Sequence, residues 1–453
     1  MFDAFRAEVA AARRHGDLYF ASLLSAEVIL SALGVASSFW QGWIYTPEVT
    51  IWVFLSQCLS ADHSCRDAVA RLAAWRVAQG LSACSADTGA YCTAREHLPE
   101  TACLELVRQT GQDLEDQAPR EWCWHGRRVR VADGATITMP DTAENQAEYP
   151  QQQNQKPGCG FPIARILVVF SLAVGTVLEV AIRPYAGKQT GENSMFRTLH
   201  DSLAVGDVVL ADRYFSGWFD VALLGQRGVD VVVRKHQLRT TDFRSGRRLG
   251  RDDHVVHWAK PCRPDWMSHE DYAALPGELE LREVRVRVTQ HGFRPKSLVI
   301  VTTLLDAEEF SASAIADLYR QRWQAELNLR SLKTVLTMEH LRCKTPHRVR
   351  NELYMHLLGY NLVRKAMTLA AIDSGVCPWQ ISFKGTLQTL NTFLPLLISC
   401  MAIAEGSQAL LACIAAHVVG DRPDRFEPRV IKRPPKKYKR MREPRQDYRR
   451  RAA

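Results

Sequence analysis

One stretch of the sequence combines four side chains that could act together: Tyr319, Arg322, Glu326 and Lys333. At about 100° per residue the four fall within an arc of roughly 60°, so we expect them on one face of a single helix. A neighbouring stripe of Leu and Ala should face the core, which puts Glu326 at the edge of the buried side. A carboxylate there is costly unless it meets a cation or a metal ion. The alternative is a solvated helix with surface ion pairs from Arg322 to Glu326 and from Glu326 to Arg330.

Two aspartates could join Glu326 in one metal site. Asp133 lies within a predicted strand, and Asp212 ends a short buried-strand pattern, VVLA. Three carboxylates at one sheet edge are the ligands that hard cations such as Mg²⁺ prefer, with positions left open for water and phosphate. Two such ions, about 3.5 to 4 Å apart, can activate an attacking oxygen and stabilise a leaving one in phosphodiester cleavage.

Each aspartate also has a simpler interpretation. Asp133 precedes Gly134, and an isolated Asp-Gly pair is typical of a tight turn. Asp212 could pair with Arg213 or cap the next helix. Three further carboxylates rank lower because they follow a proline, lie on a helix and lie in a turn, respectively: Asp141, Asp201 and Asp207.

The elements that would position these carboxylates follow an α/β pattern. After Arg128, β-branched runs separated by Pro and Gly predict three strands, the last two meeting around Gly175. A helical stretch from Ser194 to Leu203 leads to the VVLA strand, and a helix around Trp218 to Arg227 and the strand VDVVVRK follow. Three strands, then helix, strand, helix and strand, is the order of an RNase H-like core.

The rest of the chain divides around this core. The predicted regions are a helical N-terminal domain expected to bind DNA (1–122), the first part of the RNase H-like core (123–235), a β-rich insertion (236–299), the second part of the core with the catalytic helix (300–375), a helical C-terminal region (376–421) and a basic flexible tail (422–453). In the first region, an N-cap near Ser64 and apolar spacing from Val69 to Leu81 predict a helix. A plain helical bundle is an equal alternative to a DNA-reading motif.

The formal net charge of +9 is concentrated at the C-terminus. Residues 422–453 contain 14 Lys and Arg against 4 Asp and Glu, whereas the remainder of the chain carries 44 bases and 45 acids. Because prolines interrupt this tail, we expect an extended, flexible arm suited to phosphate contacts. A disordered, solubilising end is the alternative.

The composition argues against a disulfide-rich secreted protein and against a membrane protein. Hydrophobic residues make up 46% of the 453 residues, enough for a folded chain of two to four domains. The 12 cysteines include no C-x-x-C pair, so we expect mostly buried free thiols of a cytosolic protein rather than a zinc site. Neither an export signal nor a membrane-spanning segment is apparent.

The motifs around the three carboxylates resemble those of a known family. Asp133 in ADGATITMPDT, Asp212 in VVLADRYFSG and the Y-x-x-R-x-x-x-E-x-x-x-x-x-x-K pattern in YRQRWQAELNLRSLK are similar to the DDE transposases of the insertion sequence four family. The resemblance covers roughly Arg128 to Arg342 and includes a β-rich insertion between the second Asp and the Glu. It departs at Ala135, where a small hydroxyl residue is expected, and Thr136 could supply that role.

This resemblance implies a metal-dependent DNA transposase. Asp133, Asp212 and Glu326 would be the catalytic residues and would bind two Mg²⁺ or Mn²⁺ ions, with Asp133 bridging them. The enzyme would cleave DNA at the transposon ends and transfer the freed 3′-hydroxyl into target DNA. Its partners would be double-stranded DNA and a second copy of the chain in a synaptic homodimer, without a membrane. The expected location is the bacterial cytoplasm, with nucleoid association when DNA is bound.

The resemblance also implies DNA contacts on the catalytic helix. Tyr319, Arg322 and Lys333 would hold phosphates, because Arg offers a bidentate fork, Lys a point charge and Tyr a hydroxyl donor. Arg330 is a further candidate on the same helix. Some family members stack a tryptophan on a flipped base, and the candidates for that role are Trp258, Trp266 and Trp323. A buried core position is the alternative for the first two.

A second class of function is a catalytically inactive or repurposed transposase that regulates by binding DNA. The presence of all three carboxylates favours the active enzyme. A cellular nuclease on the same fold would differ in having no preference for particular end sequences.

Overall fold

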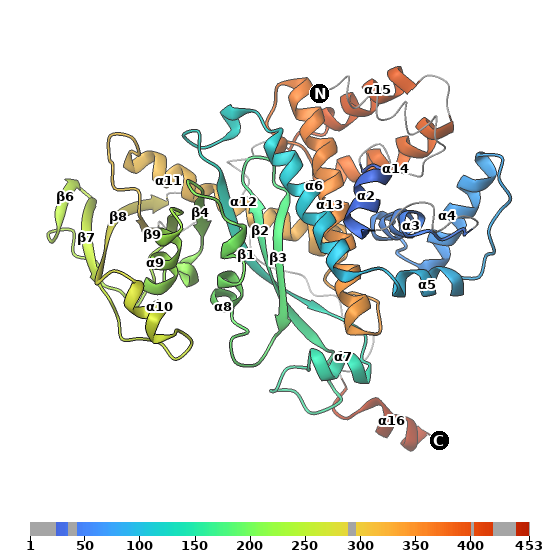
Figure 1. Cartoon of the computed structure of the whole chain (residues 1–453), viewed down its shortest axis with the longest axis horizontal. Helices are drawn as coiled ribbons and strands as arrows, with labels where there is room; N and C mark the ends of the chain where they lie inside the picture. The colour runs from blue at the N-terminus through green and yellow to red at the C-terminus, as the bar shows by residue number, and fades with distance from the viewer. Residues whose placement is uncertain (1–23, 35–42, 289–295, 400–402, 420–440, 453) are drawn as a thin grey trace.

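A mixed nine-stranded sheet runs through the described part of this computed structural model (Figure 1). The structure describes residues 24–34, 43–288, 296–399, 403–419 and 441–452. The strand order is β3-β2-β1-β4-β5-β9-β8-β7-β6. The strands are β1 (Val129–Thr138), β2 (Ile163–Ser171), β3 (Val177–Pro184), β4 (Val208–Ala211), β5 (Asp230–Arg234), β6 (Arg247–Gly250), β7 (Asp253–Ala259), β8 (Glu278–Val288) and β9 (Lys296–Thr302). The chain is therefore an α/β protein built on one large sheet.

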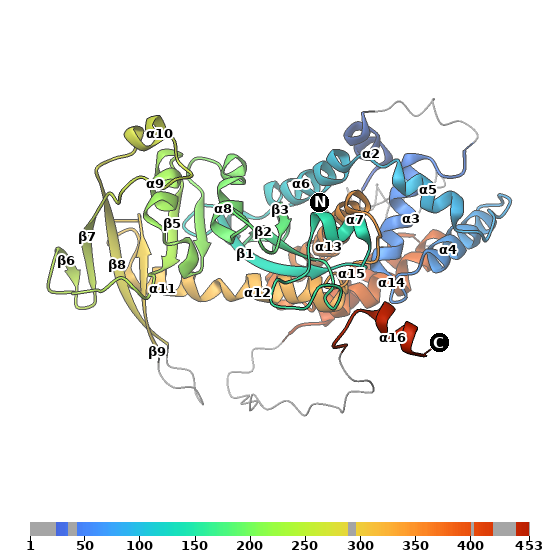
Figure 2. The ribbon, with the colours of Figure 1, turned by 90° about the horizontal axis from the view of Figure 1, so that it is seen from below.

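Helices precede the sheet, cover it and follow it (Figures 1 and 2). They are α2 (Ala26–Leu33), α3 (Pro47–Leu59), α4 (Cys65–Ala78), α5 (Gly89–Glu96), α6 (Glu100–Asp116), α7 (Ala143–Glu148), α8 (Glu192–Arg197), α9 (Trp218–Gln226), α10 (His269–Ala274), α11 (Ala312–Gln321), α12 (Trp323–Arg330), α13 (Pro346–Ser374), α14 (Phe383–Ser399), α15 (Ile403–Ala416) and α16 (Arg445–Ala452). Within the described ranges, no helix has the length and apolar character needed to cross a membrane.

The predicted order of three strands, helix, strand, helix and strand is present from β1 to β5. β1, β2 and β3 pair antiparallel, and Gly175 has a left-handed φ of 73° between β2 and β3. β4 then joins the other side of β1 in parallel, and β5 follows β4 in parallel. The span predicted as an insertion (236–299) holds β6, β7, α10 and β8. β9 pairs with β5, so these strands extend the same sheet.

The central strands are buried on both faces. Val208 and Leu210 of β4 belong to the hydrophobic cluster shared with α3, α6 and α13, whereas Val209 and Ala211 belong to a second cluster with α8 and α9. Successive side chains of a strand point to opposite faces, so a strand covered on both sides needs a continuous apolar run. This accounts for the VVLA pattern directly before Asp212.

Asn361 of α13 joins that long helix to the edge of the sheet. Its Nδ2 donates to the carbonyl oxygens of Val177 at 2.9 Å and Val107 at 3.0 Å. Its Oδ1 accepts from the Val177 N–H at 2.8 Å. A buried amide that satisfies three backbone groups fixes the start of β3 against α13 and α6.

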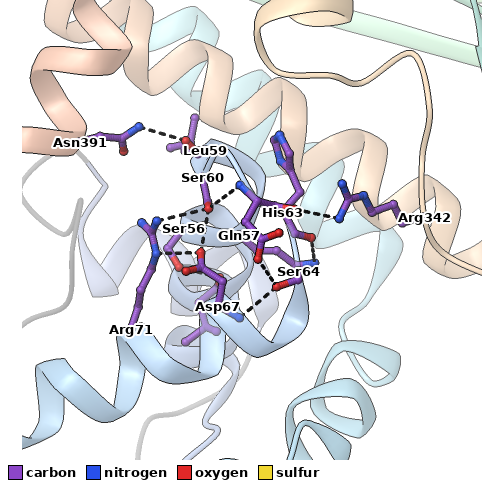
Figure 3. A network of polar contacts seen from close by, with 12 residues as sticks. Ser56, Gln57, Leu59, Ser60, His63, Ser64, Asp67, Arg71, Arg342 and Asn391 are labelled. Atoms are coloured by element: carbon purple, nitrogen blue, oxygen red, sulfur yellow. Dashed lines mark hydrogen bonds and ion pairs between the residues drawn. The ribbon is translucent and has the colours of Figure 1, made fainter.

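The junction of α3 and α4 contacts two C-terminal segments, as Figure 3 shows. Ser64 caps α4, as the sequence predicted, by accepting from the Asp67 N–H at 3.1 Å. Arg342 donates to the Asp62 carbonyl at 3.0 Å, and Asn391 of α14 donates to the Leu59 carbonyl at 3.1 Å. The N-terminal helices are thus tied to the chain that follows the predicted catalytic helix.

Two predictions of helical structure are corrected. The stretch from Ser194 to Leu203 is not one helix, because α8 ends at Arg197 and a separate 3₁₀ turn covers His200–Ser202. The basic tail was expected to be extended, yet residues 445–452 form α16, where prolines are absent. Residues 420–440 of the tail region and residues 1–23 lie outside the described ranges.

The prediction of mostly buried cysteines is also wrong. All eleven cysteines in the described ranges are free thiols. Only four are fully buried, and Cys262 and Cys413 are exposed. Burial of a small apolar residue depends on which helix face meets the core, and the scattered cysteines follow no such stripe.

Candidate active site

Asp133 on β1 and Asp212, directly after β4, stand in the same register. β1 and β4 pair in parallel with Val131 opposite Leu210, so two residues further on Asp133 comes level with Asp212. Neighbouring strands lie about 4.8 Å apart, and this spacing sets the separation of the two backbones. Asp133 lies inside β1, so the Asp-Gly pair is not a turn.

Asp212 directly follows β4 and retains an extended backbone, with φ −82° and ψ −177°. Its Oδ1 accepts from the Tyr214 N–H at 2.7 Å, so it caps the 3₁₀ turn Arg213–Phe215. The capping role considered for Asp212 is therefore real. It leaves the second carboxylate oxygen without a hydrogen-bond partner among the described residues.

Glu326 lies on α12, which packs against β1. Nη2 of Arg322 donates to its Oε1 at 2.7 Å, which is the ion pair expected one helical turn apart. The side chain of Glu326 is 37% exposed and that of Arg322 is 20% exposed. Glu326 therefore occupies the border between core and solvent, as its place beside the apolar stripe predicted.

The helix that carries these residues is not uniform. α11 ends at Gln321, α12 begins at Trp323, and a π-helical turn covers Ser331–Val335. A π turn holds more residues per turn than an α-helix, so the angular position of Lys333 differs from the value expected at 100° per residue. Lys333 still faces the site, and its Nζ lies 3.7 Å from Glu339.

A cleft of about 640 Å³ lies between β1 and the segment formed by α12 and the π turn after it. One side is formed by Asp133 to Thr136, with Arg165, Tyr185 and Glu192. The other side is formed by Glu326, Leu329, Arg330, Lys333, Thr334 and Glu339. The cleft thus gathers carboxylates at its centre and three basic side chains around them, an arrangement suited to a phosphate diester held beside a metal ion.

Burial raises the pKa of Asp133 to about 6. The Gly134 N–H, which donates to Asp133 Oδ1 at 3.0 Å, and Arg322 lower the pKa, whereas Glu326 and Glu192 raise it. Burial also raises the pKa of Tyr319, with Asp212 raising it further and Arg322 opposing. Glu326 and Glu192 thus act on Asp133, whereas Asp212 acts on Tyr319 and Glu192.

The donor set suits a hard divalent ion in its chemistry, because every candidate ligand is a carboxylate. As the side chains stand, no three His, Cys, Asp or Glu residues in the described ranges are arranged to hold a metal ion. Glu326 is engaged by Arg322, and Asp212 is engaged by the backbone of Tyr214. Arg322 engages only Oε1 of Glu326, and Oε2 has no hydrogen-bond partner among the described residues, so it is open to a metal ion.

The family model described as the transposase DDE domain matches residues 124–362. The chain belongs to the transposase DDE domain family. It is a DNA transposase, and its resemblance to the insertion sequence four family is confirmed. The transposase InsG of insertion sequence element IS4 from Escherichia coli (strain K12) is 27% identical over 354 residues, which cover 76% of each chain.

Two further relatives share less with this DDE transposase. The putative transposase InsL of insertion sequence element IS186A from Escherichia coli (strain K12) is 38% identical over 65 residues, 14% of this chain and 18% of its own. Among solved structures, the piggyBac transposase synaptic complex with hairpin DNA matches with a TM-score of 0.41 and 10% identity, covering 90% of this chain and 86% of that chain.

The rival aspartates lie in other environments of this DDE transposase. Asp207 is buried in an ion pair with Arg130, at 2.8 Å. Asp201 pairs with Arg227 at the surface, and Asp141 accepts a hydrogen bond from Gln146. None of the three lines the cleft, and Asp212 does not line it either. Asp212 differs from the three by its register with Asp133.

The three tryptophan candidates differ in exposure. Trp258 is buried, its Nε1 lies 3.3 Å from Glu283, and the Arg239 guanidinium covers its ring at 4.0 Å. Trp266 is 38% exposed, but a guanidinium lies 3.8 Å above its ring. Trp323, at the start of α12, is 53% exposed. The core interpretation is favoured for Trp258, and the base-stacking role stays a prediction for the others.

Glu192, Arg165 and Tyr185 line the cleft but were missed from the sequence. The carboxylates considered were those of the first and fourth strands, Glu326 and three rivals, Asp141, Asp201 and Asp207. A usable signal was present, since Glu192 lies two residues before Ser194, where the helix after the third strand was predicted to begin. In a sheet whose third strand returns along β2, that turn brings the chain back to the edge where β1 exposes Asp133.

Proposed function

We propose that this transposase cleaves DNA at the ends of its own insertion element and inserts the freed 3′-hydroxyl end into target DNA. The observation that carries the proposal is the level placement of Asp133 on β1 and Asp212 directly after β4, with Asp133 and Glu326 lining the same cleft. Transposases of this family generally use divalent metal ions. We propose two Mg²⁺ or Mn²⁺ ions, held by Asp133, Asp212 and Glu326.

When bound, such ions would supply an activated attacking oxygen and a stabilised leaving oxygen. The protein side chains would hold the ions and the reacting DNA strand in position. In hydrolysis, a water oxygen bonds to phosphorus as the phosphorus bond to the 3′-oxygen breaks, which leaves a 3′-hydroxyl. In strand transfer, that hydroxyl oxygen bonds to a target phosphorus and a target 3′-oxygen leaves. Parallel pairing of β1 and β4 keeps two of the three acids fixed during both steps.

Phosphate binding is assigned to the basic side chains of the same cleft. Lys333 and Arg330 line it beside Glu326, where their charges meet a DNA strand directly. Arg322 is paired with Glu326 in the absence of DNA, so we propose that a phosphate takes over its guanidinium and frees the carboxylate. Tyr319 and Trp323 complete the proposed DNA-contacting set.

The finer architecture is part of the proposal. The order β3-β2-β1-β4-β5, antiparallel among the first three and parallel from β1 to β5, supports an RNase H-like core. We keep the division into regions given above, with 1–122 binding DNA. Synapsis of two transposon ends requires two copies of the active site, so a homodimer on DNA in the cytoplasm is proposed.

Strand cleavage tests the proposed function. Asp212→Asn should reduce the rate of Mg²⁺-dependent cleavage of DNA carrying the ends of the element by at least about 100-fold, because one of the three proposed metal-binding carboxylates is lost. Asp201→Asn is the matched control, since Asp201 is exposed and outside the cleft, and should cleave like wild type. Cleavage by Asp212→Asn at the wild-type rate would exclude this site. Equal cleavage of unrelated DNA would favour a nuclease instead.

A further inference from the structure

Two free thiols face each other where α4 meets α5. Cys65 is the first residue of α4, and Cys92 lies within α5. The Cys92 thiol donates to Cys65 Sγ, and the two sulfur atoms are 4.0 Å apart. Both residues are partly exposed to solvent. The sulfur atoms of a disulfide are about 2.05 Å apart, so the two side chains would have to turn toward each other by only about 2 Å for a bond to form.

Hydrogen-bond donors converge on the sulfur of Cys65. Arg95 donates through Nη1 at 3.4 Å, and Gln57 donates through Nε2 at 3.7 Å. Cys65 also stands at the start of a helix, and a guanidinium and a helix N-terminus both stabilise negative charge on sulfur. Burial raises the pKa of Cys92, and the negative charge of Cys65 raises it further. The pair therefore favours a protonated Cys92 that donates to Cys65.

The guanidinium of Arg95 is buried without a carboxylate in contact. It is 7% exposed, and its hydrogen-bond acceptors among the described residues are Gln57 Oε1 at 3.2 Å and the sulfur atoms of Cys65 and Cys343. A buried cation is costly unless an anion lies beside it. Burial and the charge of Glu352 hold the pKa of Cys343 well above its usual value. Cys65 is thus the sulfur left to carry the negative charge.

We infer that Cys65 and Cys92 form a redox modification site, which hydrogen peroxide converts to a reversible disulfide between α4 and α5. The Cys65 thiolate bonds to one peroxide oxygen as the O–O bond breaks, and the other oxygen takes a proton and leaves as water. The Cys92 sulfur then bonds to the Cys65 sulfur as the S–O bond of this sulfenic acid breaks, and the hydroxyl group leaves as water with the Cys92 proton. Two thiols are oxidised and one peroxide is reduced. A thiol reductant reverses the bond.

The pair lies beside the junction between the N-terminal helices and the chain that follows the catalytic helix. Cys65 directly follows Ser64, which caps α4 at the junction in Figure 3. Arg95 spans the same junction, because its Nη2 donates to Cys343 Sγ at 2.9 Å. A disulfide sulfur carries no negative charge, so oxidation would leave Arg95 without its anion. This inference is independent of the metal-dependent chemistry proposed above.

Peptide mapping of the full-length protein tests the site. The reduced protein is freed of reductant, treated with hydrogen peroxide, alkylated and digested with trypsin and an Asp-specific protease, which leaves Cys65 and Cys92 on separate peptides, 62–66 and 87–95. Mass spectrometry should find the two peptides linked, with two hydrogen atoms lost, and dithiothreitol should separate them. Absence of this linked peptide from the oxidised wild type, or an equal yield from protein oxidised in denaturant, would overturn the inference.

Variants assign the roles of the two sulfur atoms. Cys65→Ser and Cys92→Ser should each lose the linked peptide, whereas Cys262→Ser, which removes an exposed thiol elsewhere, should form it like wild type. Dimedone, which traps sulfenic acids, should label Cys65 in Cys92→Ser at least about 10-fold more than Cys92 in Cys65→Ser. Equal labelling would overturn the assignment of Cys65 as the attacking sulfur. The linked peptide of the wild type decides the site itself, even if a variant does not fold.

Discussion

Asp133 is partly buried near two carboxylates, Glu326 and Glu192, and one guanidinium, that of Arg322. Burial raises its pKa, and Glu326 and Glu192 act in the same direction, while the Gly134 N–H and Arg322 act against them. The protein thus holds the Asp133 carboxyl group at a position where its charged form is disfavoured. In the absence of a metal ion, that arrangement should cost folding stability.

The pH dependence of stability tests this cost. The carboxyl of Asp133 has a pKa of about 6 in the folded chain against an ordinary value of 3.8, so the folded state binds the proton more tightly. Stability is therefore lost as the pH rises from about 4 to about 6, and the full loss, up to about 3 kcal/mol, persists above that.

Asp133→Asn removes the titrating group and keeps its shape. In chelator, the free energy of unfolding of Asp133→Asn relative to wild type should rise between pH 4 and pH 7.5 by up to about 3 kcal/mol. Denaturant unfolding at the two pH values measures the difference. A difference that does not vary with pH would contradict the environment described for this side chain.

At the scale of elements, α13 supports the sheet that presents the acids. Its Asn361 satisfies Val177 and Val107 through three buried hydrogen bonds. These bonds connect the sheet edge at β3 to the helices on one face.

Asn361→Leu should destabilise the protein by about 2 to 4 kcal/mol, because the buried N–H and carbonyl of Val177 lose their partner. Chemical denaturation measures the change. Asn154→Leu, at an exposed turn position, is the control and should stay within about 0.5 kcal/mol of wild type. Equal stabilities of the two variants would show that the three bonds contribute nothing net.

Elements with a strong local signal could be predicted from the sequence. β4 was read from VVLA and the helix cap from Ser64, because burial on both faces and capping leave residue-level patterns. The π turn after Arg330 and the helix in the tail were missed, because neither follows from local spacing alone. Glu192 was missed for a related reason: only the packing of α8 against β2 and β3 brings it to Asp133.

At the scale of the whole molecule, charge is divided between a nearly neutral body and a basic tail. Residues 422–453 carry 14 bases and 4 acids, and the rest of the chain carries 44 bases and 45 acids. DNA affinity that arises from phosphate contacts falls with salt in proportion to the number of contacts. The tail is therefore the main candidate for contacts that do not depend on DNA sequence.

Deleting residues 422–453 should weaken DNA binding on all sequences and reduce the dependence of log K on log salt by several units of slope. Fluorescence anisotropy at a series of salt concentrations measures both. Replacing the 14 bases of the tail with Gln is the matched control, since it keeps the length and should reproduce the deletion. An unchanged slope would leave the tail as a solubilising segment.

Because β1 and β4 pair directly in parallel, the relative position of the two aspartates does not depend on the length of the chain between them. Asp133 and Asp212 are level because their strands are neighbours, whatever the path of residues 134–211. Turns in that span can gain or lose residues without moving either carboxylate. One residue inserted within β1 before Asp133, in contrast, would turn its side chain to the opposite face. Length variation among natural relatives should therefore collect in the turns and be excluded from these two short strand segments.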